Sequence, residues 1–236
     1  MFADAHLHMT DPEFDDGYDD ISDAALLFSN TARPSEYERL GAMRRHDCRI
    51  VPFYGTHPWY SDEYRKDALE EIVKRDTDAN IGEIGLDSKR GDVEKQMPVF
   101  LSQLEIASRY GRIASIHAVG CENEILNALR EYRIRAILHS FSGPVSYVKP
   151  FRECGCWFSV SPRIFSKSPD KVVSILKAIP ANRLLLETDA PGNHNNCILM
   201  SEHAENVANA LGIPFREVAD TTLRNACTLL GRDIPL

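Results

Sequence analysis

Short apolar runs recur along the whole chain, and polar or turn-forming residues bound each run. Most of the runs are nearly continuous and rich in branched or aromatic side chains, which is typical of parallel strands buried on both faces. A run of this kind predicts one strand. We expect eight of them, at Phe2–His8, Ala24–Ser29, Arg49–Tyr54, Asn80–Ile84, Arg112–Ile116, Ile134–Leu138, Cys156–Val160 and Arg183–Leu186.

Between these runs, apolar residues recur every three to four positions, which predicts helices with one buried face. The clearest is Asp92–Tyr110, and Gly111 is expected to end it. Ser35, Ser61 and Ser168 are expected to cap three others, because a serine side chain accepts from free backbone N–H groups at a helix start. The expected helices are Ser35–His46, Ser61–Arg75, Asp92–Tyr110, Glu122–Tyr132, Val145–Glu153, Pro169–Ala178, Leu199–Leu211 and Pro214–Leu230.

The alternation of strands and helices predicts an α/β fold, most simply a distorted (β/α)8 TIM-type barrel. A doubly wound parallel sheet is the alternative. No linker, low-complexity tract or internal repeat interrupts the pattern, so residues 1–236 are expected to form one domain. In such barrels the active site lies at the C-terminal ends of the strands, which directs attention to the residues at those ends.

Composition narrows the classes of function. The net charge of −8 excludes a globally basic nucleic-acid-coating surface, so any contact with nucleic acid is expected to be local. No apolar run of about 18 residues predicts a membrane span, and the first residues do not resemble a signal peptide. We expect a cytoplasmic protein whose scattered cysteines are reduced thiols: Cys48, Cys121, Cys154, Cys156, Cys197 and Cys227.

Chemistry-bearing residues gather where the predicted strands end. Asp4, His6 and His8 are expected on one face of the first strand, because strand side chains alternate. Alone, such a histidine pair fits a metal site or an exposed edge strand about equally well. Later strand ends carry Glu83, His117, His139 and Asp189.

Each of these later residues has an ordinary structural explanation. His117 and His139 fit hydrogen-bonded core histidines, Glu83 fits a turn between two glycines, and Asp189 fits a cap before Pro191. Together with His6 and His8 they make six such residues at strand ends, and six separate coincidences are a poor explanation. Four histidines and two carboxylates suit Zn, Mn, Ni or Fe, and their number exceeds one tetrahedral site. It fits two metals joined by a bridging carboxylate, an arrangement used for hydrolysis, most naturally of a phosphate ester.

Over essentially its whole length the sequence resembles the TatD family of metal-dependent deoxyribonucleases, within the amidohydrolase-like enzymes. The segments that carry the resemblance are DAHLH (Asp4–His8), GTHP (Gly55–Pro58), GEIGLD (Gly82–Asp87), His117, HSFSG (His139–Gly143), ETDAP (Glu187–Pro191) and RNACTLLG (Arg224–Gly231).

The resemblance implies two divalent metal ions, which could be Zn, Mn, Ni or Mg. It implies that His6, His8 and Asp189 hold one ion and that His117 and His139 hold the other. Glu83 would bridge the two ions. His57 would face the substrate, although a turn residue before Pro58 is a competing explanation.

The sequence departs from the family where substrate is expected to bind. Ala118-Val119 follow His117 in place of a serine and an arginine, and Ser88-Lys89-Arg90 replace an aromatic-rich segment. The segment after Pro191, Gly192–Asn196, lacks the usual arginine. Lys89, Arg90 and Arg163 remain as local positive charges, and we take Lys89 and Arg163, with His57, as candidate substrate-binding residues.

Together with the resemblance, these observations predict a phosphodiesterase of 3′–5′ exonuclease type that acts on the ends of DNA, expected to be single-stranded, with Asp189 and Glu83 as catalytic residues. Asp189 is expected to orient the attacking water and take its proton, and Glu187 to support the ligands. Two alternatives remain: a deacylase or amidase acting on a small or RNA-linked substrate, and a binding protein with a degenerate site. No membrane and no obligate protein partner is expected.

Overall fold

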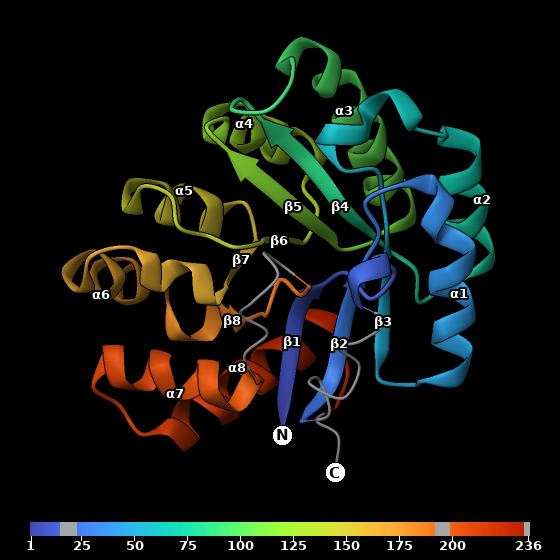
Figure 1. Ribbon diagram of the computed structural model, residues 1–236. Coiled ribbons are helices and arrows are strands. Elements are labelled where there is room, and N and C mark those ends of the chain that lie inside the picture. The colour runs from blue at the N-terminus through green and yellow to red at the C-terminus, as the bar shows by residue number, and fades with distance from the viewer. Residues whose placement is uncertain (15–22, 192–198, 234–236) are drawn as a thin grey trace.

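The computed structural model describes residues 1–14, 23–191 and 199–233. Eight parallel strands form one sheet in sequence order, and helices lie around the outside of it (Figure 1). This is the predicted α/β barrel. The strands are β1 (Phe2–Leu7), β2 (Ala24–Asn30), β3 (Ile50–Tyr54), β4 (Asn80–Asp87), β5 (Ala114–Val119), β6 (Ala136–Leu138), β7 (Cys156–Val160) and β8 (Leu184–Leu186).

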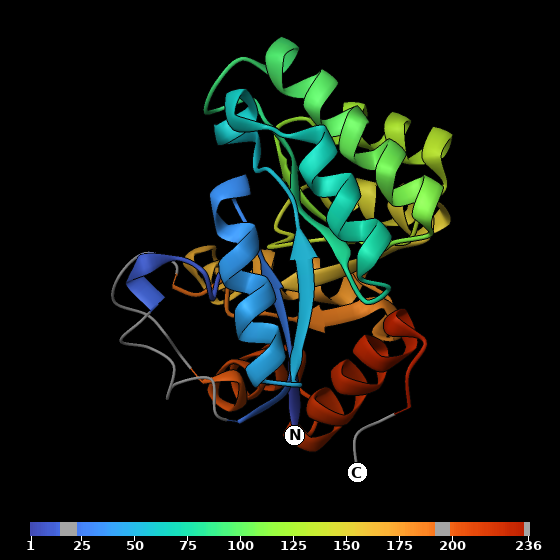
Figure 2. The same cartoon turned by 90° about the vertical axis from the view of Figure 1, so that its right-hand side faces the viewer.

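Helices follow most of the strands, as the sequence pattern predicts. Seen from the side, they pack against the outer face of the sheet (Figure 2). The α-helices are α1 (Tyr37–His46), α2 (Lys66–Arg75), α3 (Val93–Tyr110), α4 (Glu122–Tyr132), α5 (Val148–Glu153), α6 (Pro169–Ala178), α7 (Met200–Leu211) and α8 (Phe215–Leu230). The 3-10 turns are η1 (Pro12–Phe14), η3 (Pro34–Glu36), η4 (Pro58–Glu63), η5 (Val145–Tyr147), η6 (Pro162–Ser166) and η7 (Ala181–Arg183).

Alternate residues of the strands divide the apolar core into two clusters. The larger cluster lies between the sheet and the helices. The smaller one fills the barrel interior with side chains such as Phe28, Phe53 and Leu185, and Leu223 and Ala226 of α8 complete it. Because the interior is filled with apolar side chains toward the N-terminal ends of the strands, the polar interior residues gather at the opposite end.

The barrel is nearly closed rather than regular. Within the described residues no strand ladder joins β8 to β1. Instead, the end of β1 meets the segment that follows β8: Asp189 N donates to His6 O at 2.9 Å, and His8 N donates to Ala190 O at 2.7 Å. The seam of the barrel therefore lies at the predicted metal ligands. No helix in the part of the chain described here is long and apolar enough to cross a membrane.

The alternation expected along β1 breaks before the end of the strand. Ala3 and Ala5 belong to the interior cluster, whereas Leu7 belongs to the outer one. The pairing with β2 shifts between Asp4 and Leu7, which places an extra residue in β1. The simple alternation along β1, from which one face was expected for Asp4, His6 and His8, was therefore wrong. The same shift turns His6 inward, next to the interior residue Ala5.

Three predicted helix starts were also wrong. Val145 lies inside η5, so α5 begins at Val148. Ser35 lies inside η3 and Ser61 inside η4, so α1 begins at Tyr37 and α2 at Lys66. Ser61 Oγ donates to Pro58 O at 2.6 Å, a local bond that favours a turn over a cap. Asp92, by contrast, does cap α3, where its side chain accepts from Glu94 N at 2.9 Å.

Strand β4 continues three residues beyond its predicted end, and glycines explain how. Gly85 has a φ of 150°, and a Cβ there would collide with the backbone oxygen of His117 on β5. A Cβ at Gly82 would lie 2.8 Å from the Cβ of Ser115. The two glycines let β4 approach β5 closely on both sides of Glu83, and the β4–β5 pairing then runs on to Asp87.

Candidate metal centre

Glu83 lies at the centre of the polar end of the barrel interior. Its side chain is only 3% exposed. Oε2 lies 3.1 Å from His8 Nε2 and 3.5 Å from His6 Nε2. Oε1 lies 2.7 Å from His139 Nε2 and 3.0 Å from His117 Nδ1. The two oxygens of one carboxylate thus face two different pairs of histidines.

Within each pair the two ring nitrogens face each other. His6 Nε2 and His8 Nε2 are 3.2 Å apart, and His117 Nδ1 and His139 Nε2 are 3.3 Å apart. Asp189 joins the first pair, because its Oδ1 lies 4.0 Å from His6 Nε2 and 3.9 Å from His8 Nε2. The structure therefore brings together the six residues that the sequence singled out.

The hydrogen bonds of the outer ring nitrogens decide which nitrogen has a free lone pair. His8 Nδ1 lies 3.2 Å from Asn30 O, a carbonyl that only accepts. His117 Nε2 lies 3.1 Å from Asp87 Oδ2, and a carboxylate likewise accepts. Each neutral ring therefore carries its proton on the outer nitrogen and presents a lone pair to the site. Metal-ligating histidines are oriented in this way.

The second pair receives similar support from Glu187. His139 Nδ1 lies 3.5 Å from Glu187 Oε1, so His139 Nε2 faces inward. Glu187 is fully buried, and it also accepts from Ser140 N at 2.6 Å and from Ser159 Oγ. These bonds fix the carboxylate behind the histidine. A supporting role for Glu187, as the sequence suggested, fits this geometry.

His57 has the opposite arrangement. Its Nδ1 accepts from Trp59 N at 3.2 Å, so the proton of the neutral ring lies on Nε2. Nε2 lies 3.4 Å from Glu83 Oε1, to which it donates. His57, Glu83 and His117 are close enough to hold an ion together. The tautomer instead leaves the neutral His57 ring without an inward lone pair, and this separates it from His8 and His117.

Burial and charge set the protonation of the centre. Burial lowers the pKa of His6 to about 3. Burial alone would raise the pKa of Glu83, but His57, His139 and His117 outweigh it and hold that pKa well below its ordinary value. Burial alone would lower the pKa of His139, but the charges of Glu83 and Glu187 outweigh burial and raise this pKa well above its ordinary value of 6.5. The carboxylate at the centre is thus ionised, and its charge favours cations at the surrounding nitrogens.

The candidate substrate residues lie around this centre. His57, Asp189 and Arg163 line a cavity of about 240 Å³ directly over the ligands. Lys89 lines an adjoining cavity of about 360 Å³, whose wall also includes His117, His139 and Arg163. Arg163 is 59% exposed, and its Nη2 lies 3.3 Å from Asp189 Oδ2. The segment Gly192–Asn196, which lacks the arginine usual in the family, lies outside the described residues, and so does Cys197.

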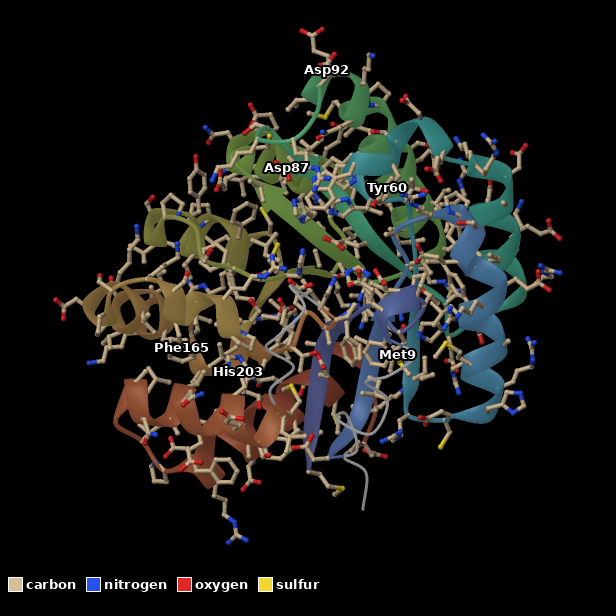
Figure 3. All side chains as sticks on the ribbon, viewed as in Figure 1. Met9, Tyr60, Asp87, Asp92, Phe165 and His203 are labelled. Atoms are coloured by element: carbon tan, nitrogen blue, oxygen red, sulfur yellow. The ribbon has the colours of Figure 1, made fainter. Side chains whose placement is uncertain are left out.

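Sequence reasoning gave no role to Asp87, although it lies within GEIGLD. In the structure its Oδ2 accepts from both His117 Nε2 and Trp59 Nε1, at 3.1 and 2.8 Å. The signal was its position: Asp87 follows Glu83 by four residues, and in an extended strand an even spacing puts both side chains on the same face. Asp87 lies at the end of β4, which packs against η4, the segment that carries Trp59 and Tyr60 (Figure 3).

Comparisons with known proteins identify the family to which the chain belongs. The family model described as TatD related DNase matches residues 3–231. The chain belongs to this family. The expectation of a hydrolase that acts on phosphoester bonds is thereby confirmed.

Relatives extend over nearly the whole chain. Deoxyribonuclease TATDN3 of Homo sapiens is 26% identical, over 98% of this chain and 94% of its own length. The uncharacterized metal-dependent hydrolase YabD of Bacillus subtilis is 24% identical, over 96% of this chain and 97% of its own. The crystal structure of YJJV, a TATD homolog from Escherichia coli, has a TM-score of 0.87 at 23% identity, and the match covers 98% of both chains. This likeness supports the fold.

Proposed function

We propose that this member of the TatD family is a two-metal phosphodiesterase that removes nucleotides from the 3′ end of single-stranded DNA. The observation that carries the proposal is the division of the Glu83 carboxylate between two histidine pairs, with Oε2 facing His6 and His8 and Oε1 facing His117 and His139. A carboxylate that offers one oxygen to each of two donor groups is what a bridging ligand requires.

The donor set fits divalent metal ions. His8 and His117 direct a lone pair inward when neutral, because their outer nitrogens face obligate acceptors, and imidazole with carboxylate suits Zn, Mn or Ni. Mg remains compatible with the carboxylates. His6, His8 and Asp189 would hold one ion, His117 and His139 the other, and Glu83 both. Two ions held in this way activate a water and stabilise the attacking and leaving oxygens of a phosphodiester.

Asp189 is proposed as the catalytic base. Its Oδ1 faces His6 and His8, while its Oδ2 faces the cavity and pairs with the exposed Arg163. An ionised carboxylate accepts hydrogen bonds through both oxygens, so Asp189 can orient the attacking water with the oxygen that is free of the ligand group. The residue adopts a φ of 58°, a conformation that aspartate tolerates better than most residues, and this aims its side chain into the cavity.

His57 is proposed to act on the substrate side. Its Nε2–H points toward Glu83 and lies in the wall of the cavity, where a proton donor can bind a phosphate oxygen. Arg163 and Lys89 supply the local positive charge that a chain of net charge −8 otherwise lacks.

The test is a substrate panel with the metal-loaded protein. A single-stranded oligonucleotide labelled at its 3′ end is incubated beside the same strand in a duplex, an RNA strand, and a set of acyl and amide compounds. We expect the label to be released as a mononucleotide, without any longer labelled fragment. Turnover of an acyl or amide compound without cleavage of any strand would overturn the proposal in favour of a deacylase or amidase.

A further inference from the structure

An exposed aromatic ring lies at the rim of the metal centre. Trp59 is 42% exposed and lines the same cavity as His57 and His117. Its ring centroid lies 4.6 Å from that of His57 and 6.1 Å from that of His117. The arrangement proposed for catalysis gives this ring no role. A large exposed aromatic next to a reactive centre is a surface on which a planar group can stack.

The ring is held in place by the metal centre itself. Its Nε1 donates to Asp87 Oδ2 at 2.8 Å, and His117 binds the same oxygen at 3.1 Å. Trp59 N also donates to His57 Nδ1 at 3.2 Å. The orientation of the indole is therefore coupled to two histidines that face Glu83. A ring fixed in this way is ordered before a ligand binds, which reduces the entropy lost on binding.

Arg90 stacks on this ring. Its guanidinium carbon lies 3.9 Å from the indole centroid. The backbone of Arg90 is fixed as well: its N donates to Asp87 Oδ1 at 3.1 Å, and its O accepts from the buried Gln96 Nε2 at 3.1 Å. One carboxylate, Asp87, thus fixes both the ring and the loop that carries the arginine.

The charge of Arg90 is not neutralised locally. The side chain is exposed, and no carboxylate in the described ranges forms an ion pair with it. Two other arginines of this rim differ: Arg33 stacks on Tyr60 but pairs with Glu63 at 3.4 Å, and Arg163 pairs with Asp189 at 3.3 Å. Arg90 is therefore the rim arginine best placed to receive an anion from outside the chain.

We propose that Trp59 and Arg90 form a substrate-binding platform, on which a base of a single-stranded nucleic acid stacks against the indole while the guanidinium binds an adjacent phosphate. Stacking on an aromatic ring beside a local positive charge is how single strands are bound without sequence preference. The proposal rests on the proposed phosphodiesterase function, and it explains how a chain with a net charge of −8 holds a strand end beside its metal centre.

Tryptophan fluorescence tests binding independently of hydrolysis. The protein has two tryptophans, and Trp157 is buried in the barrel interior, so a ligand at the rim reaches only Trp59. The metal-loaded protein is titrated with a phosphorothioate-linked single-stranded oligothymidylate. We expect saturable quenching, and we expect Trp59→Phe to lose it while the emission of Trp157 stays unchanged. Absence of quenching at concentrations above the KM of the phosphodiester strand of the same sequence would overturn the proposal.

Steady-state kinetics separate the ring from the hydrogen bond and the charge. Trp59→Phe keeps an aromatic ring but loses the bond to Asp87, whereas Trp59→Leu removes the ring. We expect Trp59→Leu and Arg90→Gln to raise KM for a single strand by about 5–100-fold, the equivalent of one base stack, with kcat and metal content little changed. Trp59→Phe should raise KM less than Trp59→Leu does.

The chain offers a matched control. Arg183 also stacks on a tryptophan, at 4.5 Å from the ring of Trp157, but it lies before β8 at the opposite end of the barrel. Arg183→Gln should leave KM unchanged. Equal KM values for Arg90→Gln, Trp59→Leu and the unmodified protein would overturn the platform, even if strands are cleaved. Quenching by the strand without cleavage of it would leave the platform in place and remove the phosphodiesterase function.

Discussion

Lowering the pH should destabilise the fold through one histidine outside the metal centre. His203 is fully buried on α7, beside Phe165, whose ring centroid lies 6.1 Å away (Figure 3). Its Nε2 donates to Val160 O at 2.7 Å, whereas Nδ1 has no hydrogen-bond partner among the described residues. Protonation of the ring would bury a charge and an unpaired N–H, and burial accordingly lowers the pKa of His203 to about 4.

The sign and size of the effect follow from this pKa. The folded state holds His203 neutral down to about pH 4, whereas the unfolded chain takes up the proton near 6.5. The stabilisation is complete above pH 6.5 and is lost as the pH falls toward 4. Between pH 7 and pH 5 this one group should lower the free energy of unfolding by about 2 kcal/mol.

Urea unfolding at the two pH values measures this effect against a variant. In His203→Gln the side-chain amide can still donate to Val160 O, but it does not titrate. All other titratable groups are the same in the two proteins, so their contributions to the pH dependence of unfolding cancel in the comparison. We expect the unmodified protein to lose about 2 kcal/mol more than the variant between pH 7 and pH 5. Equal losses for the two proteins would show that the buried ring is not the origin of the pH dependence.

Three further predictions concern the site. Asp189→Asn should lower kcat by about 10²–10⁴-fold with little loss of metal, because asparagine keeps the shape but not the base, and near-normal turnover would remove Asp189 from the mechanism. His57→Gln should keep both metals and lose activity, since its inward nitrogen carries a proton; metal analysis showing a lost ion would make it a ligand. Alkylation of exposed Cys48 should leave turnover unchanged, because no described cysteine is a candidate ligand, and lost turnover with metal retained would contradict this.

Most of the fold could be predicted because its periodic signals are strong. The bounds of α4, α6 and β7 in the structure are the predicted ones. Proline is unfavourable inside a strand, yet β3 contains Pro52. Because β3 pairs with β4 only through Phe53 and Tyr54, beyond the proline, the missing N–H costs no bond to that strand. The helix starts after η3 and η4 could not be predicted, because serine favours turns and caps alike.

The candidate ligands, and Glu187 as their support, were visible in the sequence because they follow apolar strands, but their partners were not. Asp87 of β4 contacts His117 of β5, and Glu187 after β8 faces His139 after β6, only because the barrel brings these strand ends together. The tautomer that distinguishes His57 likewise depends on one backbone bond from Trp59. Such contacts follow from the geometry of the barrel and have no signature in the local pattern of residues.

The metal content of the purified chain tests the central claim most directly. The protein is loaded with Zn or Mn, freed of unbound metal by gel filtration, and analysed by mass spectrometry beside Glu83→Ala and Lys89→Ala. If Glu83 bridges two ions, the unmodified protein and Lys89→Ala will bind two per chain and Glu83→Ala will bind fewer, with loss of activity. Two ions retained by Glu83→Ala, or a single ion in the unmodified protein, would contradict a bridged two-metal centre.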